Sequence, residues 1–255
     1  MQISGSVALV TGGASGLGEA TVRSHVEQGG KAAILDLSEE LGNKLAAEMQ
    51  KRVIFIKTDI TKEESVQYAL EKTIESFGAV HILVNCAGIG FAQKVLGKKG
   101  MHSLNDFNRV IQINLAGSFN TIRFAAEKMA NNTPNEEGER GVIINTASAA
   151  AYEGQIGQAA YSASKSGVVG MTLPIARELA EHGIRVVTIV PGLFNTPMFA
   201  TLPEKVIDAL GKMTPFPQRL GRPSEYAKMV QSIVENPMLN GTSIRLDGAI
   251  RMQPK

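Results

Sequence analysis

The sequence lacks the features that mark several large classes of protein. Cys86 is the only cysteine among 255 residues, so no intrachain disulfide can form, and we expect a protein of a reducing compartment rather than a secreted one. Lysine and arginine number 26 against 24 aspartates and glutamates, a formal net charge of +2. This balance gives no reason to expect nucleic acid or a membrane surface as a partner, so we expect a small molecule.

Membrane spans, targeting segments and metal-binding patterns are also missing. No apolar run reaches the ~18 residues of a membrane span, and the strand-like run Val7–Val10 leaves no room for a signal sequence after Met1, so we expect a cytoplasmic protein. No group of Cys, His or carboxylates has metal-ligand spacing, so we expect no metal. A Ser-His-Asp triad is not indicated either, and we expect surface positions for the four histidines, which are His25, His81, His102 and His182.

Short apolar runs alternate with longer amphipathic segments along the chain. The runs are nearly continuous, as in strands buried on both faces, and the segments between them are long enough for crossover helices. This pattern predicts one α/β domain over residues 1–255, a Rossmann-type doubly wound parallel sheet with helices on both faces. The expected strands are Val7–Thr11, Lys31–Asp36, Val53–Asp59, Ile82–Asn85, Val142–Thr146, Arg185–Val190 and Thr242–Leu246.

Two segments interrupt this alternation. The polar, turn-rich segment Asn131–Arg140 is expected to be a surface loop. The segment Gly192–Leu220 combines four prolines with large apolar residues, which favours a substrate lid, although an ordinary packed excursion is the alternative. Its candidate wall for an apolar ligand consists of Phe194, Met198, Phe199, Leu202 and Phe216.

A glycine-rich turn follows the first predicted strand directly and opens a helical pattern. In this sequence, TGGASGLG at 11–18, Gly12, Gly16 and Gly18 would let the backbone approach a pyrophosphate at the positive end of the next helix. Thr21 stands where a third glycine would complete the usual G-x-G-x-x-G spacing. A purely structural turn is therefore the alternative.

Asp36 ends the second predicted strand, 20 residues after Gly16. An acidic side chain at this point can accept hydrogen bonds from the adenosine ribose hydroxyls, and its charge would repel a 2′-phosphate. The sequence thus predicts NAD rather than NADP as the cofactor. The alternative role for Asp36 is a helix cap before Ser38.

Tyr161 and Lys165 are four residues apart and would share one face of a helix. A phenol with an ordinary pKa of about 10 is a poor base at neutral pH, but a neighbouring ammonium stabilises phenolate. Ser148 follows the predicted strand Val142–Thr146 at its carboxyl end, where doubly wound folds bind ligands. Its hydroxyl could hold the oxygen of a reacting alcohol.

These motifs together resemble the short-chain dehydrogenase/reductase family over nearly the whole chain: TGGASGLG at 11–18, NCAG at 85–88, Ser148, YSASK at 161–165 and PG at 191–192. The resemblance implies that Tyr161 is the acid/base, that Lys165 lowers its pKa and binds the nicotinamide ribose, and that Ser148 orients the substrate. It also implies that Asn114 helps to hold a proton-relay water. Cys86 replaces the second asparagine of the usual N-N-A-G, so only backbone contacts are expected there.

The same resemblance implies a set of cofactor contacts. Asp59 would meet the adenine, Asn85, Ala87 and Gly88 would line the adenosine side, and Thr196 would contact the carboxamide. The full set expected to bind NAD is Gly12, Ser15, Gly16, Leu17, Gly18, Asp36, Asp59, Ile60, Asn85, Ala87, Gly88, Tyr161, Lys165, Pro191, Gly192, Phe194 and Thr196.

Three features are similar to a subfamily, the type 2 3-hydroxyacyl-CoA dehydrogenases, also described as type 10 17β-hydroxysteroid dehydrogenases. They are the glycine turn with Asp36, an insertion at about 90–103 and the ending Leu246–Pro254. This likeness implies NAD-dependent oxidation of (S)-3-hydroxyacyl-CoA in fatty acid metabolism, with Gln155 beside Ser148 and Tyr161 at the substrate. It also implies a homotetramer, and a mitochondrial location if the source is an animal.

Several alternatives stay open at the level of sequence. Lys94, Lys98 and Lys99 in the insertion could bind CoA phosphates or could simply be solvated. The substrate could be a hydroxysteroid or another secondary alcohol without CoA, because the reactive residues do not choose among alcohols. A non-catalytic NAD-binding partner protein is the alternative from a different class.

Overall fold

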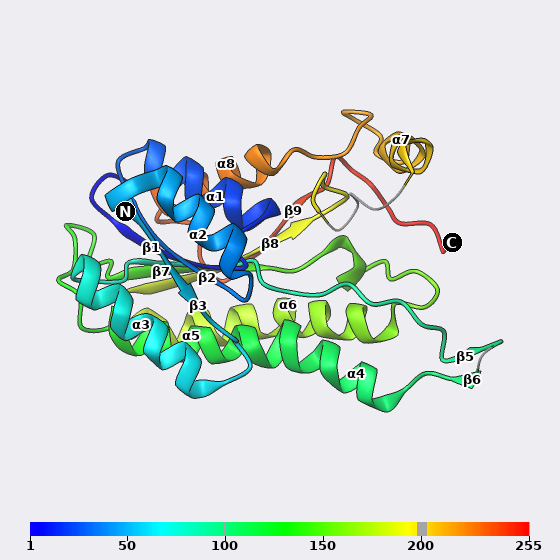
Figure 1. The fold of residues 1–255 in the computed structure, drawn as a ribbon, viewed down its shortest axis with the longest axis horizontal. Helices are drawn as coiled ribbons and strands as arrows, with labels where there is room; N and C mark the ends of the chain where they lie inside the picture. The colour runs from blue at the N-terminus through cyan, green and yellow to red at the C-terminus, as the bar shows by residue number, and fades with distance from the viewer. Residues whose placement is uncertain (99, 198–202, 255) are drawn as a thin grey trace.

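The computed structural model describes residues 1–98, 100–197 and 203–254, and its centre is a seven-stranded parallel sheet (Figure 1). The strand order β3-β2-β1-β4-β7-β8-β9 reverses direction between β1 and β4. This confirms the predicted doubly wound α/β fold. The strands are β1 (Val7–Thr11), β2 (Lys31–Asp36), β3 (Val53–Lys57), β4 (Ile82–Asn85), β7 (Gly141–Thr146), β8 (Ile184–Pro191) and β9 (Ser243–Leu246).

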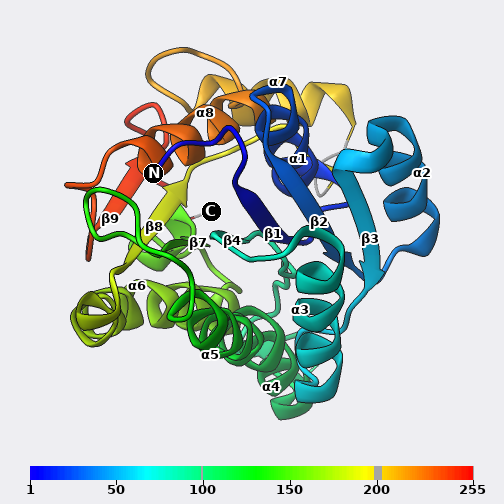
Figure 2. The same cartoon turned by 90° about the vertical axis from the view of Figure 1, so that its left-hand side faces the viewer.

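Helices cover both faces of the sheet, as Figure 2 shows along the strands. One face carries α1 (Gly16–Glu27), α2 (Glu39–Met49) and α8 (Pro223–Glu235). The other face carries α3 (Glu63–Phe77), α5 (Ser118–Met129) and α6 (Ala159–Leu179). Every residue of β1, β4, β7 and β8 is buried, which explains why their sequences are apolar without alternation.

The remaining elements lie at the carboxyl ends of the strands or connect the main helices. Helix α4 (Leu104–Ile111) continues through a π-helical stretch, Gln112–Gly117, into α5. Helix α7 (Glu204–Lys212) lies in the segment expected to be a lid. A small hairpin of β5 (Leu96–Gly97) and β6 (Gly100–Met101) is formed by the insertion, and single 3₁₀ turns are formed by Gln50–Arg52, Ala149–Ala151 and Ala180–His182.

The ends of β3, β7, β8 and β9 differ slightly from the prediction. The third strand stops at Lys57 instead of Asp59, because Thr58 bonds back to Asp36 and Asp59 turns its carboxylate to Thr61. The backbone therefore leaves the sheet two residues early, which puts Asp59 in a loop above it.

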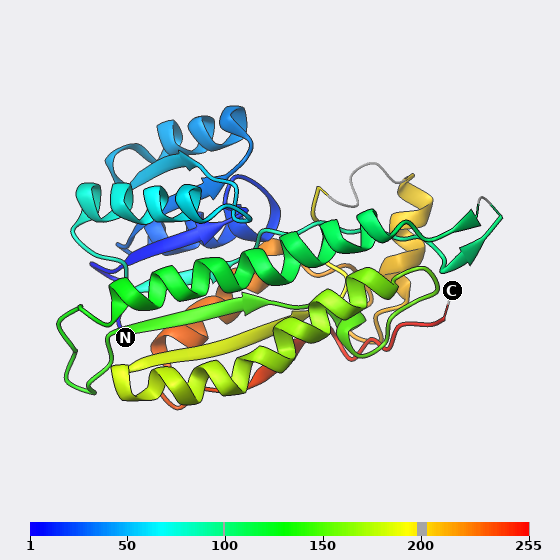
Figure 3. The same ribbon diagram turned by 90° about the horizontal axis from the view of Figure 1, so that it is seen from below.

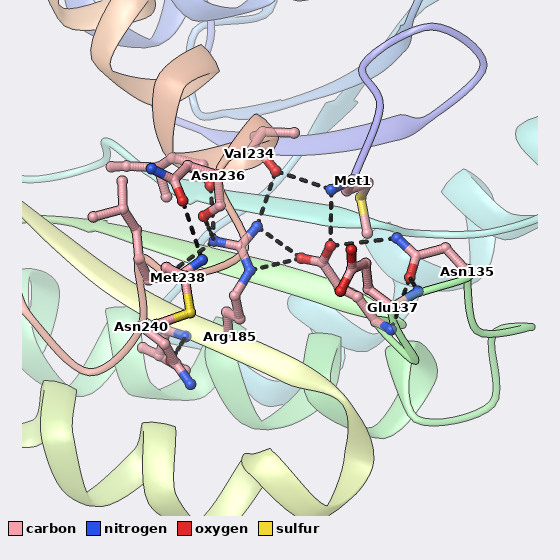
Figure 4. A network of polar contacts seen from close by, with 12 residues as sticks. Met1, Asn135, Glu137, Arg185, Val234, Asn236, Met238 and Asn240 are labelled. Carbon is pink, nitrogen blue, oxygen red and sulfur yellow. Dashed lines mark hydrogen bonds and ion pairs between the residues drawn. The ribbon is translucent and has the colours of Figure 1, made fainter.

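A buried ion pair lies at the end of the sheet opposite to the glycine turn. Arg185 of β8 bonds Glu139 through Nε at 2.7 Å, and its terminal nitrogens donate to the carbonyls at the end of α8. Figure 4 shows Arg185 and Met1 converging on this cluster, where the Met1 ammonium lies 2.8 Å from Glu139 Oε2. Glu139 is only 6% exposed, so the prediction that the whole segment Asn131–Arg140 is a surface loop is wrong at this residue.

The expectation of surface histidines is wrong for His25. This side chain lies on the buried face of α1, is 5% exposed and contacts Ser6, and desolvation lowers its pKa to about 4. It is therefore a neutral core residue at neutral pH. His81 is half-buried and its Nδ1 accepts the Val7 N–H, which is also a structural role.

Within the described ranges, no helix is long and apolar enough to cross a membrane. The same ranges contain no cluster of His, Cys, Asp and Glu that could hold a metal ion.

Candidate active site

The glycine turn is shaped so that backbone lies open at the start of α1. Gly12 and Gly16 have φ values of +61° and +55°, a region that suits glycine, and Gly12 N–H donates to the Leu35 carbonyl. A Cβ on Gly12 would lie 2.8 Å from Ala87 N. A Cβ on Gly18 would run into the carbonyl of Gly12. The turn thus brings β1, β4 and the N-terminus of α1 together without side chains between them.

A cavity of about 630 Å³ lies over this turn, at the point where the strand order reverses. Eleven of the predicted NAD contacts line it. They are Gly12, Ser15, Gly16, Leu17, Gly18, Asp36, Asp59, Ile60, Ala87, Gly88 and Thr196. Cys86, where backbone contacts were expected, also lines the cavity, and the lining residues that the prediction did not name are Leu35, Leu37, Thr58, Thr61, Ile89, Arg109, Gln112, Ile113 and Pro197.

Asp36 lies on the wall of this cavity with both carboxylate oxygens in use. Its Oδ2 accepts the Ala14 N–H at 3.1 Å and its Oδ1 accepts the Ser38 N–H at 3.0 Å. The two interpretations of Asp36 are therefore compatible, because the carboxylate braces the glycine turn and the start of α2 while it faces the cavity. A carboxylate oxygen has lone pairs left for a ribose hydroxyl.

Asp59 lines the same cavity from the loop after β3. Hydrogen bonds from the hydroxyl and the N–H of Thr61, at 2.7 and 3.0 Å, lower the pKa of this carboxyl. Asp59 is thus an ionised acceptor at neutral pH.

Asn85 is absent from the lining of this cavity, and its predicted place on the adenosine side stays a prediction. Its amide lies inside the sheet, where Nδ2 donates to Asn145 Oδ1 and Oδ1 accepts from Thr121 Oγ1 at 2.7 Å. Thr11 donates to the same oxygen and accepts the Ala87 N–H. Asn85 therefore supports the cavity floor from below, because strand alternation turns it inward while Cys86 turns outward.

A second cavity, of about 460 Å³, adjoins the first and shares Leu17, Cys86, Gly88, Ile89 and Thr196 with it. It brings together the three residues predicted to react, Ser148, Tyr161 and Lys165. The other predicted residues on its wall are Gln155, Pro191, Gly192, Phe194 and Thr196.

Tyr161 and Lys165 lie one turn apart in α6 and both line this cavity, Lys165 as a buried side chain and Tyr161 as a half-buried one. Burial raises the pKa of the Tyr161 phenol, and a hydrogen bond with the Ser148 hydroxyl acts in the opposite direction. Burial lowers the pKa of the Lys165 ammonium to about 8. Lys165 Nζ lies 5.8 Å from the centre of the Tyr161 ring and donates to the Thr146 carbonyl at 2.8 Å.

Asn114 lies in the π-helical stretch between α4 and α5 and is completely buried. Its amide exchanges hydrogen bonds with the backbone of Ile89, at 2.8 and 3.0 Å, and donates to Ser164 Oγ at 3.1 Å. The side chain therefore ties the loop after β4 to α6. Its role with a proton-relay water stays a prediction.

Gln155 lines the second cavity, but its amide is occupied by the C-terminal tail. Gln155 Nε2 donates to the Gln253 carbonyl at 3.0 Å, and Ile156 N–H donates to the Pro254 carbonyl at 3.0 Å. These bonds bring Met252 onto the cavity wall. The sequence prediction placed Gln155 at the substrate and did not find Met252, whose position depends on this long-range contact.

The apolar wall differs in part from the one expected. Phe194 lines the second cavity, whereas Phe216 is 84% exposed and lies outside its lining, so the prediction for Phe216 is wrong in this conformation. Met198, Phe199 and Leu202 lie outside the described residues. The missed apolar wall residues are Phe91, Leu193, Leu210 and Met252.

The insertion extends from the molecule as the hairpin of β5 and β6, next to the N-terminal end of α4 (Figure 3). Lys94 and Lys98 are exposed on it, and Lys99 lies outside the described residues. At the hairpin base, Gln93 N–H donates to the Gly157 carbonyl at 2.8 Å. The insertion is thereby joined to the loop that precedes Tyr161.

The first cavity fits a dinucleotide by its shape and its chemistry. Glycines occupy the positions of the turn at which a Cβ would fill the space. The N-terminus of α1, with its free N–H groups, lies at the same place. The acidic Asp36 lies at the end of the neighbouring strand β2. A parallel doubly wound sheet with this cavity, next to a second cavity lined by Ser148, Tyr161 and Lys165, defines a nucleotide-dependent oxidoreductase.

Comparisons with known proteins agree with this class. The model of the short chain dehydrogenase family matches residues 6–207. The chain is 56% identical over 254 residues to the 3-hydroxyacyl-CoA dehydrogenase type-2 of Drosophila melanogaster, covering 99% of this chain and 100% of that protein. The chain belongs to the short-chain dehydrogenase family.

Solved structures support the same assignment. A crystal structure of 3-hydroxyacyl-CoA dehydrogenase type-2 from Mycobacterium avium is 41% identical, with a TM-score of 0.94 and coverage of 98% of both chains. A 3-ketoacyl-(acyl-carrier-protein) reductase from Brucella melitensis, complexed with NADH, is 28% identical, with a TM-score of 0.88 over 98% of this chain and 100% of that one.

Proposed function

We propose that this protein is an NAD-dependent dehydrogenase that oxidises (S)-3-hydroxyacyl-CoA to 3-oxoacyl-CoA. The observation that carries the proposal is that Ser148, Tyr161 and Lys165 line one cavity, which adjoins the dinucleotide cavity. The relative from Drosophila melanogaster, matched over its whole length, supports the acyl-CoA substrate. The reductase that binds NADH supports the cofactor.

NAD, when bound, supplies the acceptor for the hydride that leaves C3 of the alcohol. Ser148 holds the substrate oxygen through its hydroxyl, and Tyr161 removes the hydroxyl proton as a phenolate. Burial raises the pKa of the Tyr161 phenol, and the positive charge of Lys165 on the same helix face would favour the phenolate. In the direction of reduction, Tyr161 returns the proton to the oxygen.

The acyl chain would lie against Phe91, Leu193 and Met252 in the second cavity. We propose that Gly192–Leu220 acts as a lid over this cavity. We also propose that Lys94 and Lys98 bind the CoA phosphates. Residues 1–255 are proposed to form one domain. We also propose a homotetramer joined through the helices at 107–128 and 161–180. The proposed compartment is the cytoplasm, or the mitochondrion if the source is an animal.

A substrate panel tests the proposed function. With saturating NAD, we expect (S)-3-hydroxybutyryl-CoA and longer 3-hydroxyacyl-CoA esters to be oxidised with a kcat/KM at least about tenfold above that of hydroxysteroids and of CoA-free 3-hydroxybutyrate, a difference of about 1.4 kcal/mol. Initial rates of NADH formation measure this directly. A higher kcat/KM for a hydroxysteroid would replace the proposed substrate, and NAD binding without turnover of any alcohol would indicate a non-catalytic protein.

The cofactor preference depends on Asp36. We expect Asp36→Asn to lower the ratio of kcat/KM with NAD to kcat/KM with NADP by about 10- to 100-fold. The reason is that the variant no longer repels the 2′-phosphate of NADP with a nearby negative charge. Glu39→Gln is the matched control, since Glu39 is exposed at the start of α2 and pairs with Lys57. A wild-type preference for NADP, or an unchanged ratio in Asp36→Asn, would contradict the assignment.

A further inference from the structure

Three polar side chains from three separate elements meet beside Lys165. Cys86 follows β4, Thr146 ends β7, and Tyr226 comes from α8 on the far side of the sheet. The oxygens of Thr146 and Tyr226 are 2.7 Å apart, Cys86 Sγ lies 3.6 Å from Tyr226 Oη, and Thr146 Oγ1 lies 3.7 Å from Cys86 Sγ. Tyr226 is completely buried, so its hydroxyl depends on these partners.

The donors and acceptors of these groups close into a ring. Cys86 donates to Tyr226, and Thr146 donates to Cys86. Each group has one proton to donate, so Tyr226 must donate to Thr146 for all three contacts to be hydrogen bonds. Burial raises the pKa of both Cys86 and Tyr226, which keeps the ring neutral and its protons in place.

Thr146 connects this ring to the reactive group. Its carbonyl accepts the hydrogen bond from Lys165 Nζ at 2.8 Å, deep in the second cavity. The titratable groups that face Lys165 are Tyr161 on its own helix and Cys86 on the loop after β4, with Tyr226 on α8 behind Thr146. Among the described residues, the lining of this cavity contains no carboxylate. The ammonium therefore relies on the dipole of the Thr146 carbonyl.

We propose that the hydrogen-bonded ring of Cys86, Thr146 and Tyr226 positions Lys165 by holding the end of β7 at a fixed distance from its ammonium. Tyr226 is then a positioning residue that acts from the opposite face of the sheet, and it makes no contact with substrate. Position 86 has a specific reason to carry a small group that both donates and accepts, as the Cys86 thiol does where it lines both cavities.

Removal of one hydrogen-bonding member of the ring, which opens the ring, should change the protonation of Lys165. A carbonyl held at hydrogen-bond distance stabilises the charged ammonium, so its displacement favours the neutral amine. The pKa of Lys165, about 8 in the intact protein, would fall further. Loss of the ammonium removes the charge that supports the Tyr161 phenolate, so the alkaline limb of kcat/KM would move to lower pH.

Matched substitutions open or preserve the ring. Cys86→Ala, Thr146→Val and Tyr226→Phe each remove one member, whereas Cys86→Ser and Thr146→Ser retain a hydroxyl that donates and accepts. Titration of the lysine 13Cε resonances by NMR, with the Lys165 signal assigned through Lys165→Met, measures the pKa directly. We expect a decrease of about half a pH unit or more in the opened variants, since one hydrogen bond to a charged group corresponds to roughly one pKa unit.

Two further comparisons separate positioning from packing. The double variant Thr146→Val with Tyr226→Phe should shift the Lys165 pKa no further than either single one, because the ring is already open. Tyr68→Phe on α3 is the control for a lost phenol hydroxyl, since Tyr68 is 52% exposed. Circular dichroism and thermal melts confirm that each variant is folded before titration.

Unchanged titration of Lys165 in Tyr226→Phe and Thr146→Val would overturn the proposal. So would an equal shift in the serine variants, because volume rather than the ring would then be responsible. The pH profile of kcat/KM rests on the proposed dehydrogenase function, whereas the NMR titration needs no substrate or cofactor. A wild type without turnover of acyl-CoA therefore contradicts the proposed function and leaves this test intact.

Discussion

Tyr161→Phe is expected to lower kcat by about 10²- to 10⁴-fold, the usual contribution of a positioned proton donor or acceptor. The substitution removes a single oxygen from a ring that α6 holds in place, so the fold and the cofactor cavity should be unchanged. We expect the Kd for NADH, measured by fluorescence titration, to stay within about twofold of wild type, a difference of less than about 0.5 kcal/mol. A combined fall in kcat with constant NADH affinity identifies a group that acts on the reacting oxygen.

The control for this substitution is Tyr152→Phe. Tyr152 is 53% exposed, just after the 3₁₀ turn that Ser148 caps, and it is outside the lining of the second cavity. It should keep wild-type kcat. Retained turnover in Tyr161→Phe would refute the acid/base assignment whatever the substrate is.

The same residue sets the direction of the pH dependence. Burial raises the pKa of the Tyr161 phenol, so the phenol is the main form at neutral pH. The phenolate needed for oxidation becomes more abundant as the pH rises. The phenol needed for reduction is most abundant at low pH. Oxidation should therefore be favoured by alkaline pH until Lys165, with a pKa of about 8, loses its charge.

The positions of the strands could be predicted because burial on both faces leaves a plain signal in the sequence. Val7–Thr11 and Ile82–Asn85 were predicted with their observed bounds, since every residue in them is buried and the flanking residues are not apolar. The glycine turn and Asp36 could be predicted for a similar reason. Their chemistry depends on local backbone geometry and on the order of β1, α1 and β2, which all lie between Val7 and Asp36.

The errors concern contacts between residues far apart in the chain. Asn85 was assigned to the adenosine side by the family resemblance, whereas the structure shows its amide bonded to Asn145 inside the sheet. His25 was assigned to the surface because an isolated histidine usually is, yet α1 packs it against Ser6. Met252 and Tyr226 reach the site only through tertiary packing, and no local pattern distinguishes them from other apolar residues.

The buried pair of Glu139 and Arg185 illustrates the same limit and supports a prediction of large effect. Glu139→Ala is expected to lower the free energy of unfolding by about 3–5 kcal/mol, because removal of one partner leaves an uncompensated buried charge. Arg185 would keep its bonds to the backbone carbonyls at the end of α8, but its charge and the Met1 ammonium would lose their carboxylate. Met1, Glu139 and Arg185 are all absent from the lining of both cavities of the candidate site, so the loss concerns stability rather than the chemistry of the site.

Urea denaturation followed by circular dichroism measures this loss, and Glu137→Ala provides the matched control. Glu137 is exposed in the same loop, two residues away, so its removal should change the free energy of unfolding by less than about 0.5 kcal/mol. Arg185→Met tests the pair from the other side and should also destabilise, since it leaves Glu139 buried beside the Met1 ammonium alone. A change in Glu139→Ala no larger than in Glu137→Ala would mean that water enters this end of the sheet and that the ion pair does not hold it together.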